Sequence, residues 1–130
     1  MTQQNAYTRE WISGGKILCF RFNSLGGTTA EEWFTEMMLN YDTWRQNNQR
    51  VLVLLDLRNS GNLLSAEGMA RARDLAAKFA DLEGRIALLI STNESFKNLA
   101  MFVERGLTSQ ARERQMFETE AAAIDWLLGE

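Results

Sequence analysis

The chain contains no histidine, no proline and a single cysteine in 130 residues. Without histidine, neither a Ser-His-Asp nor a Cys-His catalytic arrangement can form, and zinc lacks its usual ligand sets. No signal-peptide pattern opens the chain, and Cys19 has no second cysteine with which to form an intrachain disulfide. These features predict a protein of the reducing cytoplasm, with no metal and no cofactor.

Long apolar runs and an excess of basic charge are also missing. The longest aliphatic stretches, 51–55 and 86–90, are five residues each, whereas a membrane span needs about 20. The net charge is -3 and the sequence pI is about 5.1, which does not fit a broad nucleic-acid-binding surface. Length and the 45% hydrophobic content predict one globular domain over residues 1–130.

The most informative segment is residues 51–57, a nearly continuous apolar run. Such a run is typical of a central parallel strand that is covered on both faces of its sheet. The polar stretch 59–68 follows it and is expected at the carboxyl end of the sheet, where open α/β folds usually engage partners. Residues 85–91 form a second run of the buried type.

Apolar periodicity and turn signals predict the remaining elements. Two N-terminal strands form a hairpin and a polar edge strand lies near the C-terminus, at Tyr7–Ile12, 16–22 and 114–118. Capping residues and apolar stripes predict four helices, which begin at Thr29, Ser65, Thr92 or Asn93, and Thr119. This order predicts an α/β fold with a mixed, largely parallel five-stranded sheet and four helices.

This order of elements resembles the STAS domain of anti-anti-sigma factors, in particular its divergent SpoIIAA-like branch. Three stretches carry the resemblance: the strand at 51–57, the loop and helix start at 63–69, and the closing segment at 114–128. The resemblance implies a non-enzymatic, regulatory domain that works by docking to another protein.

The loop departs from the family's pattern at the residue that matters most for regulation. Typical members carry a phosphorylatable serine in an Asp-Ser-Ser/Thr-Gly motif. Gly68 matches the motif's glycine, but Ser65 stands at the aspartate, Ala66 at the phosphoserine and Glu67 at the following hydroxyl. The usual phosphoacceptor is therefore missing, and conventional phospho-switching does not transfer to this chain.

Three residues near the carboxyl end of the predicted strand have two interpretations each. Ser65 could be phosphorylated at a helix N-terminus, although a plain helix cap explains it. Glu67 could mimic a phosphate, although a carboxylate in the first turn also complements the helix dipole. Asp56 could bind a ligand or a cation, although hydrogen bonds from loop amides or pairing with Arg58 is the simpler interpretation.

Residues 93–108 carry two large apolar side chains outside their buried stripe, Met101 and Phe102. Exposed methionine and aromatic residues are enriched at protein interfaces. Together with the loop 59–68 and the outer face of the helix predicted to begin at Ser65, they predict a protein-docking patch. We also expect this patch to mediate a homodimer. Its residues are Asn62, Ser65, Glu67, Arg71, Arg73, Met101 and Phe102.

An alternative function is the carriage of a small apolar, lipid-like ligand, because the divergent branch has been likened to lipid-carrying domains. The candidate pocket lies between the sheet and the first helix and would be lined by Trp33, Phe34, Met37 and Tyr41. The same stripe is also what an ordinary core-facing helix shows. A third alternative is an enzyme of unfamiliar type that uses Asp56 or Glu67 with an external cofactor. The sequence favours it least, because no serine or carboxylate pair has a suitable partner.

Overall fold

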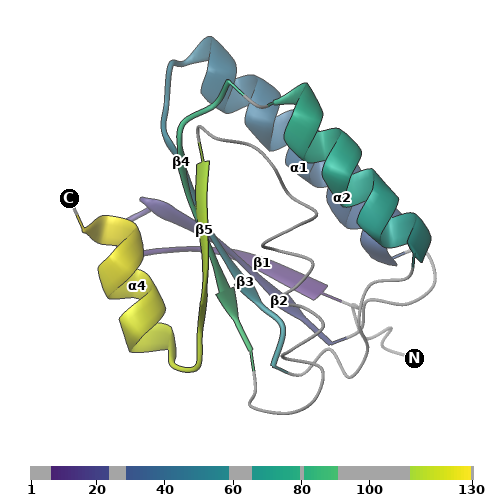
Figure 1. Ribbon diagram of the computed structural model, residues 1–130. Coiled ribbons are helices and arrows are strands. Elements are labelled where there is room, and N and C mark those ends of the chain that lie inside the picture. The colour runs from purple at the N-terminus through teal and green to yellow at the C-terminus, as the bar shows by residue number, and fades with distance from the viewer. Residues whose placement is uncertain (1–6, 24–28, 59–65, 80, 91–111, 130) are drawn as a thin grey trace, which may run out of the picture.

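The protein is described from a computed structural model, which describes residues 7–23, 29–58, 66–79, 81–90 and 112–129 (Figure 1). Five strands form one sheet in the order β1-β2-β3-β4-β5. They are β1 (Tyr7–Ile12), β2 (Ile17–Phe22), β3 (Val51–Asp56), β4 (Gly84–Leu89) and β5 (Arg112–Phe117). Strand β1 is antiparallel to β2 and the other neighbours are parallel, which confirms the predicted mixed sheet.

The described residues contain three helices: α1 (Thr29–Gln46), α2 (Ala66–Lys78) and α4 (Glu120–Leu128). Four were predicted, and the helix expected over residues 93–108 lies outside the described residues. Helices α1 and α2 cover one face of the sheet, whereas α4 covers the other (Figure 1). Right-handed crossovers explain this division, because the strands from β2 to β4 progress in one direction and their connecting helices must share a face.

Strand β3 lies in the middle of the sheet, as the apolar run predicted. It pairs in parallel with β2 on one side and with β4 on the other. Val51 and Val53 point to the face covered by α1 and α2, and Leu54 points to the opposite face, which we call the α4 face. The alternation along a pleated strand therefore places apolar side chains in both cores.

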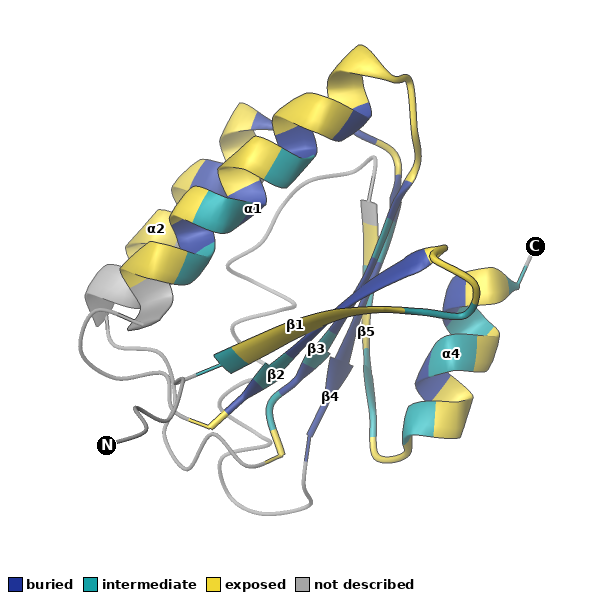
Figure 2. Cartoon of the chain, turned by 180° about the vertical axis from the view of Figure 1, so that it is seen from behind, coloured by how far each residue is buried: buried dark blue, intermediate teal, exposed yellow. Residues whose placement is uncertain are grey.

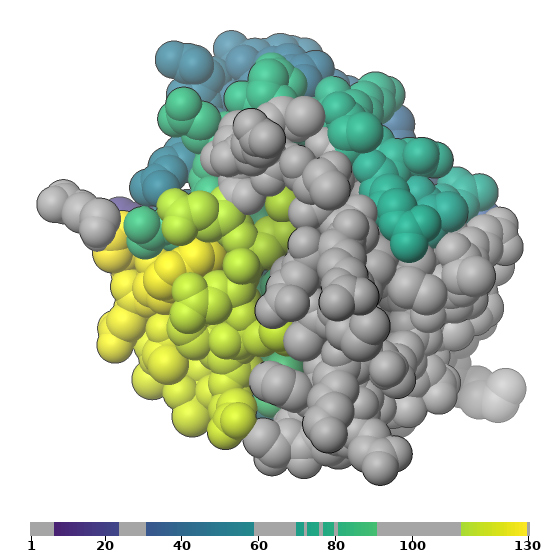
Figure 3. Space-filling model, in the orientation of Figure 1, coloured from purple at the N-terminus to yellow at the C-terminus, as the bar shows by residue number. Residues whose placement is uncertain are grey.

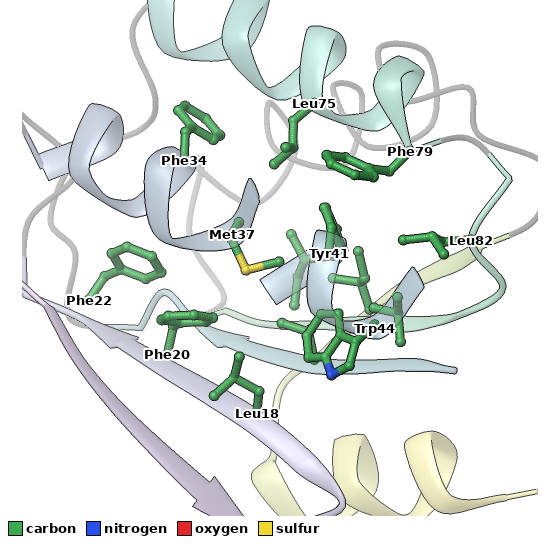
Figure 4. Close-up of a cluster of buried hydrophobic side chains, with 14 residues drawn as sticks. Leu18, Phe20, Phe22, Phe34, Met37, Tyr41, Trp44, Leu75, Phe79 and Leu82 are labelled. Carbon is green, nitrogen blue, oxygen red and sulfur yellow. The ribbon is translucent and has the colours of Figure 1, made fainter. Parts of the chain in front are cut away.

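The core beneath α1 and α2 is large and aromatic. In Figure 4 the side chains of α1 lie between those of β2 and those of α2, and Phe20 and Phe79 are fully buried. Two details differ from the sequence pattern. Met38 was expected in the buried stripe of α1 but is 36% exposed, and Leu75, which the expected stripe of α2 omitted, is buried.

The core on the α4 face is smaller. Its buried members come from four elements: Ile17, Cys19, Leu54, Ala87, Leu89, Ala123 and Leu127. Leu128 was expected to pack on the sheet but is 42% exposed, because the buried face of α4 is the one that carries Ala123 and Leu127, and Leu128 lies about 100° around the helix from Leu127. Figure 2 shows α4 mainly in the colours of exposed and intermediate residues, whereas β4 is mainly buried.

Glycine is required where β4 begins beside β3. Gly84 has φ +153° and pairs with Val51, and a Cβ atom at this position would collide with the carbonyl oxygen of Val51. A side chain here would push the two strands apart at the amino end of the sheet.

Truncation of a buried leucine of the α4 face tests the double-sided burial of β3. We expect Leu54→Ala to lower the free energy of unfolding by about 2–5 kcal/mol, because it removes buried methyl groups and leaves a cavity. The matched control is Leu39→Ala, since Leu39 is 65% exposed on α1 and its loss should cost within about 0.5 kcal/mol. Urea denaturation measures both. Similar costs for the two variants would contradict the central placement of β3.

Candidate functional site at the carboxyl end of the sheet

A buried carboxylate occupies the carboxyl end of the central strand. Asp56 is the last residue of β3, and it is the only polar or charged residue classed as buried in the described part of the chain, with 4% exposure. It stands opposite Arg21 of β2 in the parallel register, so both side chains project from the α4 face. An isolated carboxylate in such a place would be strongly destabilising, so its partners decide its role.

Both oxygens of Asp56 accept hydrogen bonds from arginine. Its Oδ1 accepts from the Arg58 backbone N–H at 3.2 Å and from Arg58 Nε at 3.0 Å, and its Oδ2 accepts from Arg58 Nη2 at 3.0 Å. Arg21 Nη1 also donates to Oδ2, at 2.9 Å. The predicted pairing with Arg58 is therefore confirmed, and no oxygen of Asp56 lacks a partner.

Arg21 extends this pairing into a network of five charged side chains. Its Nε donates to Glu10 of β1 at 2.7 Å, and its Nη1 donates to Glu120 of α4 at 2.7 Å. Arg58 Nη2 lies 3.8 Å from the same Glu120 carboxylate. We call Glu10, Arg21, Asp56, Arg58 and Glu120 the Arg21 network. It joins three adjacent strands to the start of α4.

The position of Glu120 follows from the N-cap at Thr119, which the sequence analysis predicted. Thr119 is the N-cap of α4, and its side-chain oxygen accepts a hydrogen bond from the backbone N–H of Ala122 at 3.3 Å. Glu120 is therefore in the first turn, where a negative charge also interacts favourably with the helix dipole.

The network affects the pKa values of Asp56, Arg21 and Arg58. Burial by itself would raise the pKa of Asp56, but hydrogen bonds from the side chain and backbone of Arg58 and from Arg21 outweigh it, so this pKa is lowered. The hydrogen bond with Glu120 is the largest cause of the raised pKa of Arg21, and pairing with Asp56 raises the pKa of Arg58. Burial raises the pKa of the neighbouring Cys19 thiol to about 11.

The ion pairing of Asp56 is typical of a structural role and not of a general acid or base. A general acid or base works best with a pKa near the working pH, and the pKa of Asp56 is shifted the opposite way. Within the described residues, no group of three histidine, cysteine, aspartate or glutamate side chains could hold a metal ion. Among the helices that the structure describes, none combines the length and apolarity that a membrane span requires.

The predicted docking patch is placed only in part. Asn62, Ser65, Met101 and Phe102 lie outside the described residues, and Glu67 lies in the first turn of α2 with its side chain not described. Arg71 and Arg73 are exposed on α2. Arg71 Nη2 lies 2.8 Å from Glu31 Oε1 of α1, so it also links the two helices. The patch as a whole stays a prediction.

The four residues of the alternative ligand pocket belong to the large core. Phe34, Met37 and Tyr41 are buried in it (Figure 4). Trp33 packs against it, in edge-on contact with Phe20 of β2. This arrangement favours the ordinary-core interpretation of the stripe. One polar atom does not fit it, because Trp33 Nε1 is buried and has no hydrogen-bond partner among the residues that the structure describes.

Three members of the Arg21 network did not emerge from the sequence: Glu10, Arg21 and Glu120. A signal for Arg21 was present, because it follows Ile17 and Cys19 on one face of a strand and is therefore a charge on a buried face. Its partner Glu120 lies 99 residues away, and no local pattern identifies a contact at that distance.

Comparisons with known proteins agree with the architecture. No family model matches the chain, and no curated protein matches it. Among solved structures, it is similar to the crystal structure of an uncharacterized DUF3478-family protein with a SpoIIAA-like fold from Shewanella loihica PV-4. The TM-score is 0.63 over 98% of both chains, at 19% sequence identity. The chain has a SpoIIAA-like fold. At this identity the likeness establishes the fold and not the biological role.

The lowered pKa of Asp56 predicts an acid-dependent contribution to stability. At pH 7 we expect Asp56→Asn to lower the free energy of unfolding by about 1–3 kcal/mol, because two partly exposed arginines lose their carboxylate. This contribution is present above the ordinary aspartate pKa of about 3.9 and is lost as the pH falls through the lower, folded value. The difference between wild type and variant should therefore shrink in acid.

Asp42→Asn is the matched control, since Asp42 is exposed on α1. Urea denaturation across pH 2.5 to 7 measures all three proteins. An Asp56→Asn penalty as small as that of Asp42→Asn, or one that grows toward low pH, would contradict the proposed ion pairing.

Proposed function

We propose that the chain is a single non-enzymatic domain that regulates another protein by docking to it. The observation that carries the proposal is that both carboxylate oxygens of Asp56, at the carboxyl end of β3, accept hydrogen bonds from Arg21 or Arg58. This is the edge at which open α/β folds place their chemistry. Here Asp56 is paired with two arginines that hold the structure together, so within the described residues this edge presents no carboxylate free for chemistry.

The SpoIIAA-like fold supports a role of the anti-sigma-factor-antagonist type. The docking surface proposed for it combines the loop 59–65 with the outer face of α2 and with Met101 and Phe102. Arg71 and Arg73, both exposed on α2, form its charged rim. We propose that the same surface mediates a homodimer and that the protein acts in the cytoplasm, in keeping with its single, buried cysteine.

Regulation of this docking does not require the family's usual phosphoserine. Ala66 begins α2 at the matching position and has no hydroxyl group to accept a phosphate. We propose that Glu67, in the same first turn, supplies a permanent negative charge there. Docking would then need no modification of the chain, and the fraction of bound protein would depend on the concentration of the partner.

Carriage of a small apolar ligand is the second candidate. It is favoured by Trp33 Nε1, which is buried and has no hydrogen-bond acceptor in the described part of the chain, so a ligand acceptor could bind to it beside the aromatic cluster. Native mass spectrometry of freshly purified protein separates the candidates. A carrier retains a bound mass, whereas a docking domain shows the chain mass as monomer and dimer.

Position-specific photo-crosslinking tests the docking surface. A photoreactive residue at position 73, on the outer face of α2, should crosslink the purified protein to itself and should capture a defined partner in cells of the source organism. Position 16 is the control, because Lys16 is exposed in the β1–β2 turn at the opposite end of the sheet. Equal products from both positions, or none from position 73, would count against a docking role for α2.

A further inference from the structure

Helix α4 is fastened to the sheet at both ends by arginines that belong to strands. At its start, Glu120 accepts a hydrogen bond from Arg21 of β2 at 2.7 Å. At its end, Arg85 Nη1 of β4 donates to the backbone carbonyl oxygens of Trp126 and Gly129, at 2.5 Å and 2.9 Å. A cation at a helix C-terminus satisfies carbonyl groups that lack partners within the helix. These polar contacts define where α4 lies.

The charged side chains that belong to the strands, or directly follow one, balance one another without the helix. Without Glu120, the Arg21 network contains two carboxylates, Glu10 and Asp56, and two guanidinium groups, Arg21 and Arg58, which balance. Glu120 itself is half-buried, and it keeps its favourable place in the first turn of α4 when it enters water. Separation of α4 from the sheet therefore leaves no buried charge unpaired at this end.

The same holds at the other end of α4. Arg85 Nε lies 3.7 Å from Glu113 Oε1 of β5, so the guanidinium group keeps a carboxylate of the sheet after it loses the helix carbonyls. The helix carbonyls would then bond to water. Arg21 and Arg85 therefore each keep a carboxylate partner in the sheet when α4 is released.

The apolar seal under α4 is small. Ala123 and Leu127 are its buried residues, and Ile124 and Trp126 pack against the same core while partly exposed. The centroid of the Trp126 ring lies 5.5 Å from that of Phe117 and 5.2 Å from the guanidinium carbon of Arg85. Figure 3 shows α4 and β5 together at the surface, with α4 on the outside of the molecule. By contrast, α1 contributes Phe34, Met37, Tyr41 and Trp44 to the large core. Elements with few buried contacts open at lower free energy than the domain unfolds.

We infer that α4 is a releasable strap, which swings away about residues 118–119 while the five-stranded sheet stays folded. In the described part of the chain, α4 is the only helix on this face of the sheet (Figure 1). Its release uncovers an apolar strip formed by Ile17, Cys19, Leu54, Ala87 and Leu89. The fold thus contains a second apolar surface that is closed by default and opens without loss of the main core.

Cys19 is a built-in reporter of this opening. It is fully buried beneath α4, it is the only cysteine of the chain, and its thiol is held protonated by burial. An aromatic disulfide reagent that releases a coloured thiolate therefore reacts only with molecules in which this face is open. The rate of colour release in native buffer measures the open fraction.

The experiment compares this rate with global unfolding measured on the same protein by urea denaturation. If α4 opens separately, Cys19 should react faster than it would if only globally unfolded molecules exposed it. At low urea concentrations the reaction rate should then depend only weakly on urea. We expect Glu120→Gln to raise the rate about two- to fivefold, as the loss of a half-exposed ion pair implies. Glu118→Gln is the matched control, because Glu118 is an exposed carboxylate in the hinge. It should react at the wild-type rate.

Two results would overturn the inference. One is a Cys19 reaction rate that follows the global unfolding equilibrium, with its full urea dependence, at every concentration. The other is equal rates for Glu120→Gln and Glu118→Gln. The first readout needs no substitution, so it stands even if a variant folds poorly.

Discussion

The neutralisation of one buried carboxylate organises the carboxyl end of this fold. Asp56 closes the central strand in a place where an unpaired negative charge would cost several kcal/mol. Arg58 meets that charge from two residues further along the chain, and Arg21 meets it from the neighbouring strand. Because Arg21 also binds Glu10 and Glu120, the same interaction sets the positions of the first strand and of the last helix.

The two faces of the sheet are covered to very different extents, and this difference bears on function. One face lies beneath two long helices and an aromatic core, so it is stable and fixed. The other lies beneath a helix of nine residues that has two buried side chains and polar contacts at both ends. The docking function that we propose would use both properties: a constant surface on the α1 and α2 side, and a helix on the other side whose release could respond to a partner.

Local signals accounted for most of the architecture. The apolar run at 51–57 predicted a sandwiched central strand, Thr119 predicted the start of the last helix, and Asp56 with Arg58 formed a pair close in sequence. These features depend on neighbouring residues, whose periodicity and capping chemistry the sequence displays directly. The SpoIIAA-like resemblance was carried by the same segments.

Other features depend on tertiary geometry and could not be predicted. Arg21 and Glu120 meet only because β2 and the start of α4 converge at one edge of the sheet. Met38 and Leu128 fit apolar stripes, yet each is exposed beside a buried neighbour, Met37 and Leu127, because a sequence stripe does not show how wide a face of the helix the sheet covers. The docking residues Asn62, Ser65, Met101 and Phe102 rest on the sequence alone.

The central claim is that arginine pairing, and not burial, governs the ionisation of Asp56. Carbon-13 NMR of the Asp56 side-chain carboxyl carbon across pH 2 to 7 tests this most directly, with Asp56→Asn to assign the signal. The account predicts a titration midpoint below the ordinary aspartate value of about 3.9. A midpoint above that value would show that desolvation dominates, and it would contradict the proposed architecture of the site.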